Sequence, residues 1–137
     1  MRFARIVFLL AGLYGLLSLL PLYFLFDYIG RQEPPPITHP QFYYGFAGVG
    51  LAFQFVFLVI ASDPARFRPL MIPSVLEKLG YVIPMAALYF RGRITVSDAV
   101  SSVPDAVLCL LFIAAWFGVR VRNGRRIPWP PVNVRIP

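Results

Sequence analysis

Cysteine is almost absent from this chain of 137 residues, where Cys109 stands alone. A single cysteine excludes an internal disulfide, a CxxC redox pair and a zinc site built from several thiolates. Charge is also scarce, because 14% of the residues are charged whereas soluble domains average about 25%. Histidine occurs once, and Gly-rich phosphate loops and HExxH-type metal motifs are missing. We therefore predict no cofactor, no metal site and no catalytic residue, and the sequence favours a protein that is not an enzyme.

Apolar residues are what the chain has in abundance. They make up 58% of it, and the mean hydropathy is +0.70. A chain of this length forms one domain, and a water-soluble domain of that size cannot bury so large an apolar fraction. The composition therefore predicts an all-α integral membrane protein.

Four runs are long and apolar enough to cross a bilayer as helices, which takes about 20 residues each. The first of them, Ile6 to Phe26, has no charged residue in 21 positions. Thr38 to Gln41 and Ser102 to Asp105 have the spacing of capping boxes, which predicts helix starts near Thr38 and Ser102. The expected spans are approximately residues 6–26, 40–62, 70–90 and 102–119. These runs predict a four-helix antiparallel bundle over residues 1–119.

Lysine and arginine are distributed unevenly between the two ends of this bundle. Nine of them lie before the first run, between the second and third, or after the fourth, and three lie in the other two connections. The positive-inside rule then places both termini in the cytoplasm, with the chain in the inner (plasma) membrane. Residues 120–137 are expected to form a basic, proline-rich cytoplasmic tail. Because these charges flank apolar runs and form no stripe, no nucleic-acid partner is predicted.

Polar residues inside the apolar runs are the first candidates for function, because burying them in lipid is costly. Gln54 and Glu77 each lie about eight residues from the cytoplasmic end of their runs, or about 12 Å deep, so they are expected to meet. Pro84 removes the donor for a carbonyl one turn from Glu77, which favours a kink and a small polar cavity. The alternative is that Glu77 is simply satisfied by Gln54, by Lys78, or by Arg66 and Arg68.

The connection between the second and third runs carries two arginines that flank Phe67. Because guanidinium groups bind phosphate and carboxylate, Arg66 and Arg68 are also candidates for binding a lipid head group. Asp105 is interpreted as a residue of the helix start, favoured there by the helix dipole. The predicted ligand-binding set is Gln54, Arg66, Arg68, Glu77, Lys78 and Tyr81.

The stretch from Arg66-x-Arg68-Pro69 to Pro73-x-x-x-Glu77-Lys78 resembles a helix-bounded motif of the small bacterial four-helix DoxX-like membrane proteins. Length, four spans and cytoplasmic termini are similar as well. The resemblance implies a fold type and work as an accessory membrane subunit, and it assigns a functional role to no residue.

Two functions follow as hypotheses. The first is a non-catalytic accessory or assembly subunit that packs against a larger membrane complex or a second copy of itself, through the small-residue faces Ala11/Gly15 and Gly48/Ala52. The alternative is a binding or transport bundle with a polar pocket around Glu77 for a lipophilic or anionic small molecule. The lipid bilayer is a partner in both.

Overall fold

The computed structural model describes residues 1–32 and 36–119, and this part of the chain is helical with no strand. The predicted all-α class is therefore confirmed. The elements, in chain order, are α1 (Arg2–Leu19), α2 (Leu22–Gln32), α3 (Pro40–Ser62), the short 3₁₀ helix η1 (Arg68–Leu70), α4 (Met71–Phe90), α5 (Val96–Val100) and α6 (Val103–Gly118).

Four helical segments of the described chain are long and apolar enough to cross a membrane: Arg2–Leu19, Pro40–Ser62, Arg68–Phe90 and Val96–Gly118. Large apolar side chains lie on their outer surfaces. Leu17 is 78% exposed, Phe117 78% and Phe90 85%. Soluble proteins rarely expose large apolar patches, so these four segments and their surfaces suggest a membrane protein.

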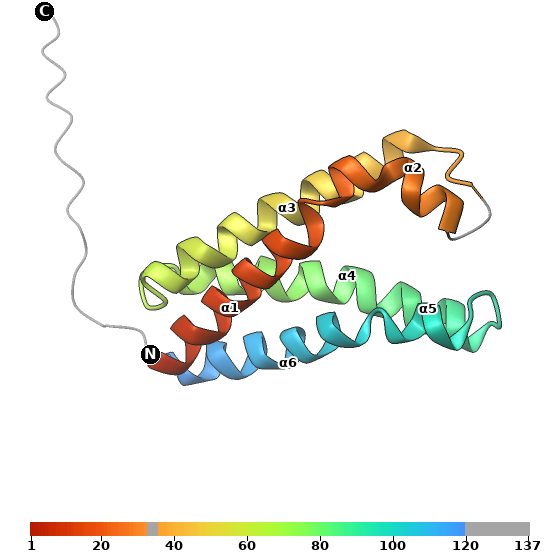
Figure 1. Cartoon of the computed structure of the whole chain (residues 1–137). Helices are drawn as coiled ribbons and strands as arrows, with labels where there is room; N and C mark the ends of the chain where they lie inside the picture. Colours follow the sequence, from red (N-terminus) through yellow and green to blue (C-terminus); the bar gives the residue numbers. More distant parts are fainter. Residues whose placement is uncertain (33–35, 120–137) are drawn as a thin grey trace, which may run out of the picture.

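Successive long helices run in opposite directions, and they are arranged in two pairs (Figure 1). Helix α1 packs on α3, and α4 packs on α6. The two pairs meet at the end that holds the N-terminus and the α3–α4 connection, and they diverge toward the end that carries α2 and α5.

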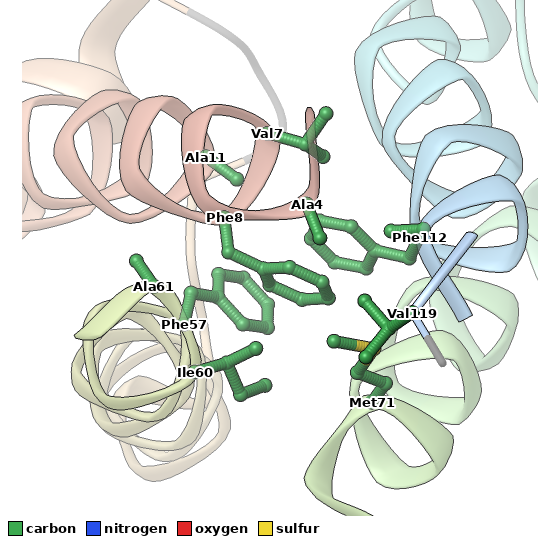
Figure 2. Packing of buried hydrophobic residues seen from close by; sticks show 11 residues of the cluster. Ala4, Val7, Phe8, Ala11, Phe57, Ile60, Ala61, Met71, Phe112 and Val119 are labelled. Carbon is green, nitrogen blue, oxygen red and sulfur yellow. The ribbon is translucent and has the colours of Figure 1, made fainter. Parts of the chain in front are cut away.

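The hydrophobic core occupies the end where the two pairs meet (Figure 2). Phe8 of α1 stacks on Phe112 of α6 with ring centroids 4.2 Å apart, and Phe57 of α3 meets Phe112 edge-on at 4.9 Å. Met71, at the start of α4, closes the same cluster. Because all four long helices contribute buried side chains here, this cluster fixes their relative positions.

The segment predicted as one span over residues 6–26 is divided in the structure. Helix α1 ends at Leu19, and α2 begins at Leu22. Between them stands Pro21, which has no N–H to continue the α1 hydrogen-bond ladder. The amide of Phe24 instead donates to the Pro21 carbonyl at 2.9 Å, which starts a new helix. The first crossing helix is therefore Arg2–Leu19, and α2 is a separate element.

The two predicted capping boxes do not form. The hydroxyl of Thr38 lies 2.8 Å from Nδ1 of His39, and α3 begins at Pro40. Ser102 precedes α6, but its hydroxyl donates to the carbonyl of Ala99 and makes no cap bond. The described chain does contain one complete capping box, at the start of α5, where Thr95 and Asp98 exchange hydrogen bonds.

Arg5 joins the start of α1 to the end of α3. Its guanidinium donates to the carbonyls of Ala61 and Ser62, both at 3.2 Å. These carbonyls lie in the last turn of α3, where no helical donor remains for them. An arginine that the sequence marks as a topological signal thus also caps a helix. The predicted tail, residues 120–137, lies outside the described residues.

Candidate binding pocket

Lys78 is a charged residue in the middle of α4 that the fold almost completely buries, with 6% of its surface exposed. Its ammonium Nζ lies 2.6 Å from Oδ1 of Asp105 on α6 and 3.2 Å from Oε2 of Glu77. The ring of Phe57 lies below it, with its centroid 5.4 Å from Nζ. A lysine ammonium in an apolar bundle requires opposite charge nearby, and these two carboxylates supply it.

Asp105 belongs to this cluster and does not cap its own helix. Sequence reasoning assigned it to the start of α6, since a carboxylate is favoured in a first helical turn. Asp105 does lie in the first turn of α6, but its carboxylate contacts the ammonium of Lys78 across the interface between α4 and α6. The interpretation of Asp105 as a helix-start residue is incomplete, because a capping pattern considers neighbours in the sequence alone. The partner of Asp105 is Lys78, which lies on another helix.

Glu77 is the second carboxylate of the cluster, and it is less completely engaged. Its Oε1 accepts a long hydrogen bond of 3.4 Å from Lys78, while its buried Oε2 lies 3.2 Å from the same ammonium as an ion pair but accepts no hydrogen bond from any described residue. The cluster formed by Glu77, Lys78 and Asp105 therefore holds two carboxylates and one ammonium. If all three are ionised, it carries one excess negative charge.

Gln54 lies on the opposite helix pair and is 2% exposed. Its side-chain Nε2 donates to the carbonyl of Gly50 at 2.8 Å. Its amide also lies directly over Gly15 of α1, where a Cβ atom would collide with it. The absence of a side chain at Gly15 thus lets α1 approach α3 and holds the amide in place. No hydrogen bond joins Gln54 to Glu77 within residues 1–32 and 36–119.

Gln54 and the charged cluster line one cavity of about 120 Å³ between the four long helices. This cavity, which we call the polar pocket, lies on the diverging side of the hydrophobic core. Its polar and aromatic lining consists of Tyr14, Ser18, Phe46, Gln54, Glu77, Lys78, Tyr81 and Asp105. Tyr81 also reaches the hydroxyl of Ser101, at 3.2 Å.

An apolar groove of about 420 Å³ adjoins the polar pocket between α1 and α6. Ala11, Tyr14 and Leu108 line both, so the two spaces are neighbours along these residues. The rest of the groove is lined by aliphatic side chains such as Leu10 and Val107, and both of these are exposed on the outer surface of the helices.

The structure brings four of the six predicted ligand-binding residues together, namely Gln54, Glu77, Lys78 and Tyr81. Arg66 and Arg68 do not line the polar pocket. Arg68 stacks on the ring of Trp116, 3.8 Å from its centroid, and donates to the carbonyl of Trp116 at 3.1 and 3.3 Å. Arg66 lies over Phe67, 5.3 Å from the ring centroid.

Sequence reasoning missed Asp105, Tyr14 and Ser18 as lining residues. For Asp105 a signal was available, because Glu77 and Asp105 are the two carboxylates inside the four apolar runs and Lys78 is the one lysine there. Opposite charges inside a bilayer are expected to pair. Tyr14 and Ser18 are four residues apart on one face of α1, but nothing in the sequence indicates which helix that face contacts.

Comparison with known protein families, curated proteins and solved structures finds no match for this chain. The candidate site therefore depends on geometry alone. Within the described ranges, no three His, Cys, Asp or Glu side chains lie close enough together to hold a metal ion.

Proposed function

We propose that the chain is an integral protein of the inner membrane that binds a small molecule in the polar pocket. The observation that carries the proposal is the cluster of Glu77, Lys78 and Asp105. Three ionisable side chains are held inside an apolar bundle and line a cavity, although burying such groups is costly. An ion pair with a structural role alone would need one carboxylate for Lys78. Here two carboxylates, Glu77 and Asp105, line the same cavity as Gln54.

The proposal includes an orientation. The nine basic residues at one end of the bundle, against three at the other, support cytoplasmic termini. The polar pocket then lies near the middle of the bilayer, beside the groove between α1 and α6. A ligand that partitions into lipid would enter the pocket from the side of this groove.

The accessory-subunit hypothesis receives less support from the packing. Of its two small-residue faces, Ala11 and Gly15 are buried inside the chain, in contact with α3. Gly48 faces the hydroxyl of Tyr23, and Ala52 alone is exposed. A partner helix therefore has little of these faces left to contact. The resemblance to DoxX-like proteins, from which the hypothesis in part derives, stays a prediction.

The proposal is tested by ligand-induced stabilisation of the purified full chain in lipid nanodiscs. A molecule that binds the folded state raises the unfolding temperature. We expect at least one of octylammonium, octan-1-ol and octanoate to do so in the wild-type protein. Ser18→Phe, which places a ring in the pocket, should abolish the shift. Leu17→Phe, a matched change on the lipid-facing side of the same helix, should preserve it.

Two outcomes would contradict the proposal. One is that none of the three compounds shifts the unfolding temperature. The other is that Ser18→Phe responds like Leu17→Phe, because binding would then occur outside the polar pocket. Stoichiometric co-purification of another membrane protein with both of these variants, together with the absence of any ligand response, would favour the accessory-subunit hypothesis.

A further inference from the structure

The polar pocket has more negative than positive formal charge. The ionisable groups that face it are Glu77, Lys78 and Tyr81 from α4, Asp105 from α6 and Tyr14 from α1. Cys109 of α6 lies nearby and is buried. With the tyrosines and the cysteine neutral, the pocket holds two carboxylates and one ammonium, and ionised carboxylates would leave one excess negative charge.

Within residues 1–32 and 36–119, no arginine lines the polar pocket to offset this excess of carboxylates. The sequence predicts a lipophilic or anionic ligand, with Arg66 or Arg68 beside Glu77. Both are directed elsewhere, Arg68 to the ring and carbonyl of Trp116 and Arg66 to Phe67. Among the described residues, an anion in the pocket would therefore meet two carboxylates with Lys78 as its one counter-charge, and that ammonium already lies 2.6 Å from Asp105. With Glu77 ionised, this charge balance favours a monovalent cation over an anion.

The lining also indicates what kind of cation fits. A dehydrated metal ion needs several oxygen ligands, whereas an organic ammonium needs one or two acceptors and aromatic faces. The pocket offers the carboxylate of Glu77 and the rings of Tyr14, Phe46 and Tyr81. Gln54 adds a side-chain amide oxygen, since its Nε2 is already engaged by Gly50.

The apolar groove provides a site for the hydrocarbon part of a ligand. It runs between α1 and α6 from the shared residues Tyr14 and Leu108, and it is lined almost entirely by aliphatic side chains. A ligand with a charged head in the pocket and one hydrocarbon chain in the groove would occupy both spaces. The chain would lie against Leu10 and Val107, and van der Waals packing in the groove would favour one chain shape over the disordered lipid around it.

We propose that the polar pocket takes the ammonium head group of a single-chain amphiphile, with Glu77 as its counter-charge and with the hydrocarbon chain in the groove between α1 and α6. This inference rests on the proposed function, because it names the ligand class of the same pocket. It predicts selectivity for cationic over neutral and anionic molecules of the same shape.

The experiment measures the affinities of octylammonium, octan-1-ol and octanoate for the full chain in nanodiscs by titration calorimetry, with empty nanodiscs subtracted. The three compounds share one chain and differ in charge. We expect octylammonium to bind about tenfold more tightly than octan-1-ol, which corresponds to about 1.4 kcal/mol, and octanoate to bind most weakly. If octan-1-ol or octanoate binds as tightly as octylammonium, the cation proposal fails while the proposed function stands. If none of them binds, the proposed function fails as well.

Variants assign the charge preference to Glu77. Glu77→Gln removes the excess carboxylate and leaves the Lys78–Asp105 pair, so it should lower the affinity for octylammonium about tenfold and leave that for octan-1-ol unchanged. Glu77→Asp keeps the negative charge and should keep the preference for octylammonium over octan-1-ol. It serves as the control that a substitution at this position does not prevent folding. Equal loss of both ligands in Glu77→Gln, or an unchanged preference, would overturn the assignment.

A second pair of variants tests the position of the chain. Val107→Trp fills the groove and should weaken octylammonium binding about tenfold, because the chain can no longer be buried there. Val49→Trp makes the same change on an exposed face of α3 that lines neither space, and it should leave the affinity unchanged. An unaffected affinity in Val107→Trp would overturn the placement of the chain.

Discussion

Lys78 and Asp105 form an ion pair of 2.6 Å between α4 and α6 in the interior of the bundle. The ammonium of Lys78 lies over the ring of Phe57, so the pair borders the hydrophobic core. It connects the two helices beside the polar pocket. The attraction between the two charges opposes the cost of removing them from water, and variants can measure which of the two free energies is larger.

Asp105→Asn should destabilise the protein by about 3 kcal/mol, because it leaves the buried ammonium of Lys78 with Glu77 as its one counter-charge. The measurement is the free energy of unfolding in mixed micelles titrated with a denaturing detergent. Asp27→Asn is the matched control, since Asp27 is exposed and makes no described side-chain contact, and its effect should stay within about 0.5 kcal/mol.

The triple variant Glu77→Gln/Lys78→Met/Asp105→Leu separates the net contribution of the buried charges from the cost of leaving one of them unpaired. Replacing all three charges by neutral side chains of similar size should return the stability to within about 1 kcal/mol of the wild type. A triple variant as unstable as Asp105→Asn would mean that the ion pair itself holds α4 against α6.

Gly15→Ala should destabilise the contact between α1 and α3. The added methyl group would collide with the side-chain amide of Gln54, which is buried and cannot leave without losing its hydrogen bond to Gly50. The expected loss is about 2 kcal/mol in the free energy of unfolding, typical of overpacking.

Gly45→Ala provides the control for that variant. Gly45 is also a helical glycine, in α3, but a Cβ there would have no neighbour within 4 Å. This substitution should stabilise the protein by about 0.5 kcal/mol, because alanine loses less backbone entropy in a helix than glycine. Equal effects at the two positions would show that the close approach at Gly15 does not constrain the fold.

The helical class and the four segments long and apolar enough to cross a bilayer follow from the sequence because they depend on run length and composition alone. The gathering of Gln54 and Glu77 at one cavity was also predicted, from their equal depth along adjacent spans. These inferences succeed because the rise per residue of a helix converts sequence position into depth. They need no knowledge of which helix faces which.

The features that failed depend on tertiary contacts. Ser102 and Asp105 have the spacing of a capping box, yet Asp105 pairs with Lys78, and Thr95 and Asp98 form the box that exists. Arg68 was expected near Glu77, but the face of Trp116 and a free carbonyl in the last turns of α6 compete for its guanidinium. A local sequence pattern shows which hydrogen-bond or ion-pair partners a side chain could have, and the packing between helices determines which of these partners it contacts.

Arg68→Lys should weaken the junction between η1 and α6 by about 1 kcal/mol. Lysine cannot stack its planar group on Trp116 or donate twice to one carbonyl, as Arg68 does. The measurement is the fluorescence of Trp116 during unfolding, in a Trp129→Phe background that leaves a single tryptophan. Arg66→Lys should leave both the spectrum and the stability unchanged, and a response equal to that of Arg68→Lys would contradict the assignment.

The proposed orientation predicts which connections can be labelled from outside the cell. In a Cys109→Ala background, Ser97→Cys places a thiol in α5 and Ser62→Cys places one at the end of α3, and both positions are exposed. If the basic end of the bundle is cytoplasmic, a membrane-impermeant maleimide should label Ser97→Cys in intact bacterial cells, and Ser62→Cys after permeabilisation alone.

The reversed labelling pattern would place both termini outside the cell. The distribution of basic residues would then have predicted the wrong orientation. Labelling of both positions in intact cells would mean that α3 and α5 end on the same side, so that the number of crossings between Ser62 and Ser97 is even. Since α4 is the one long helix between them, that result would also remove α4 from the bilayer. Glu77 and Lys78 would then lie in water, and the cost of burying their charge, on which the binding proposal depends, would disappear.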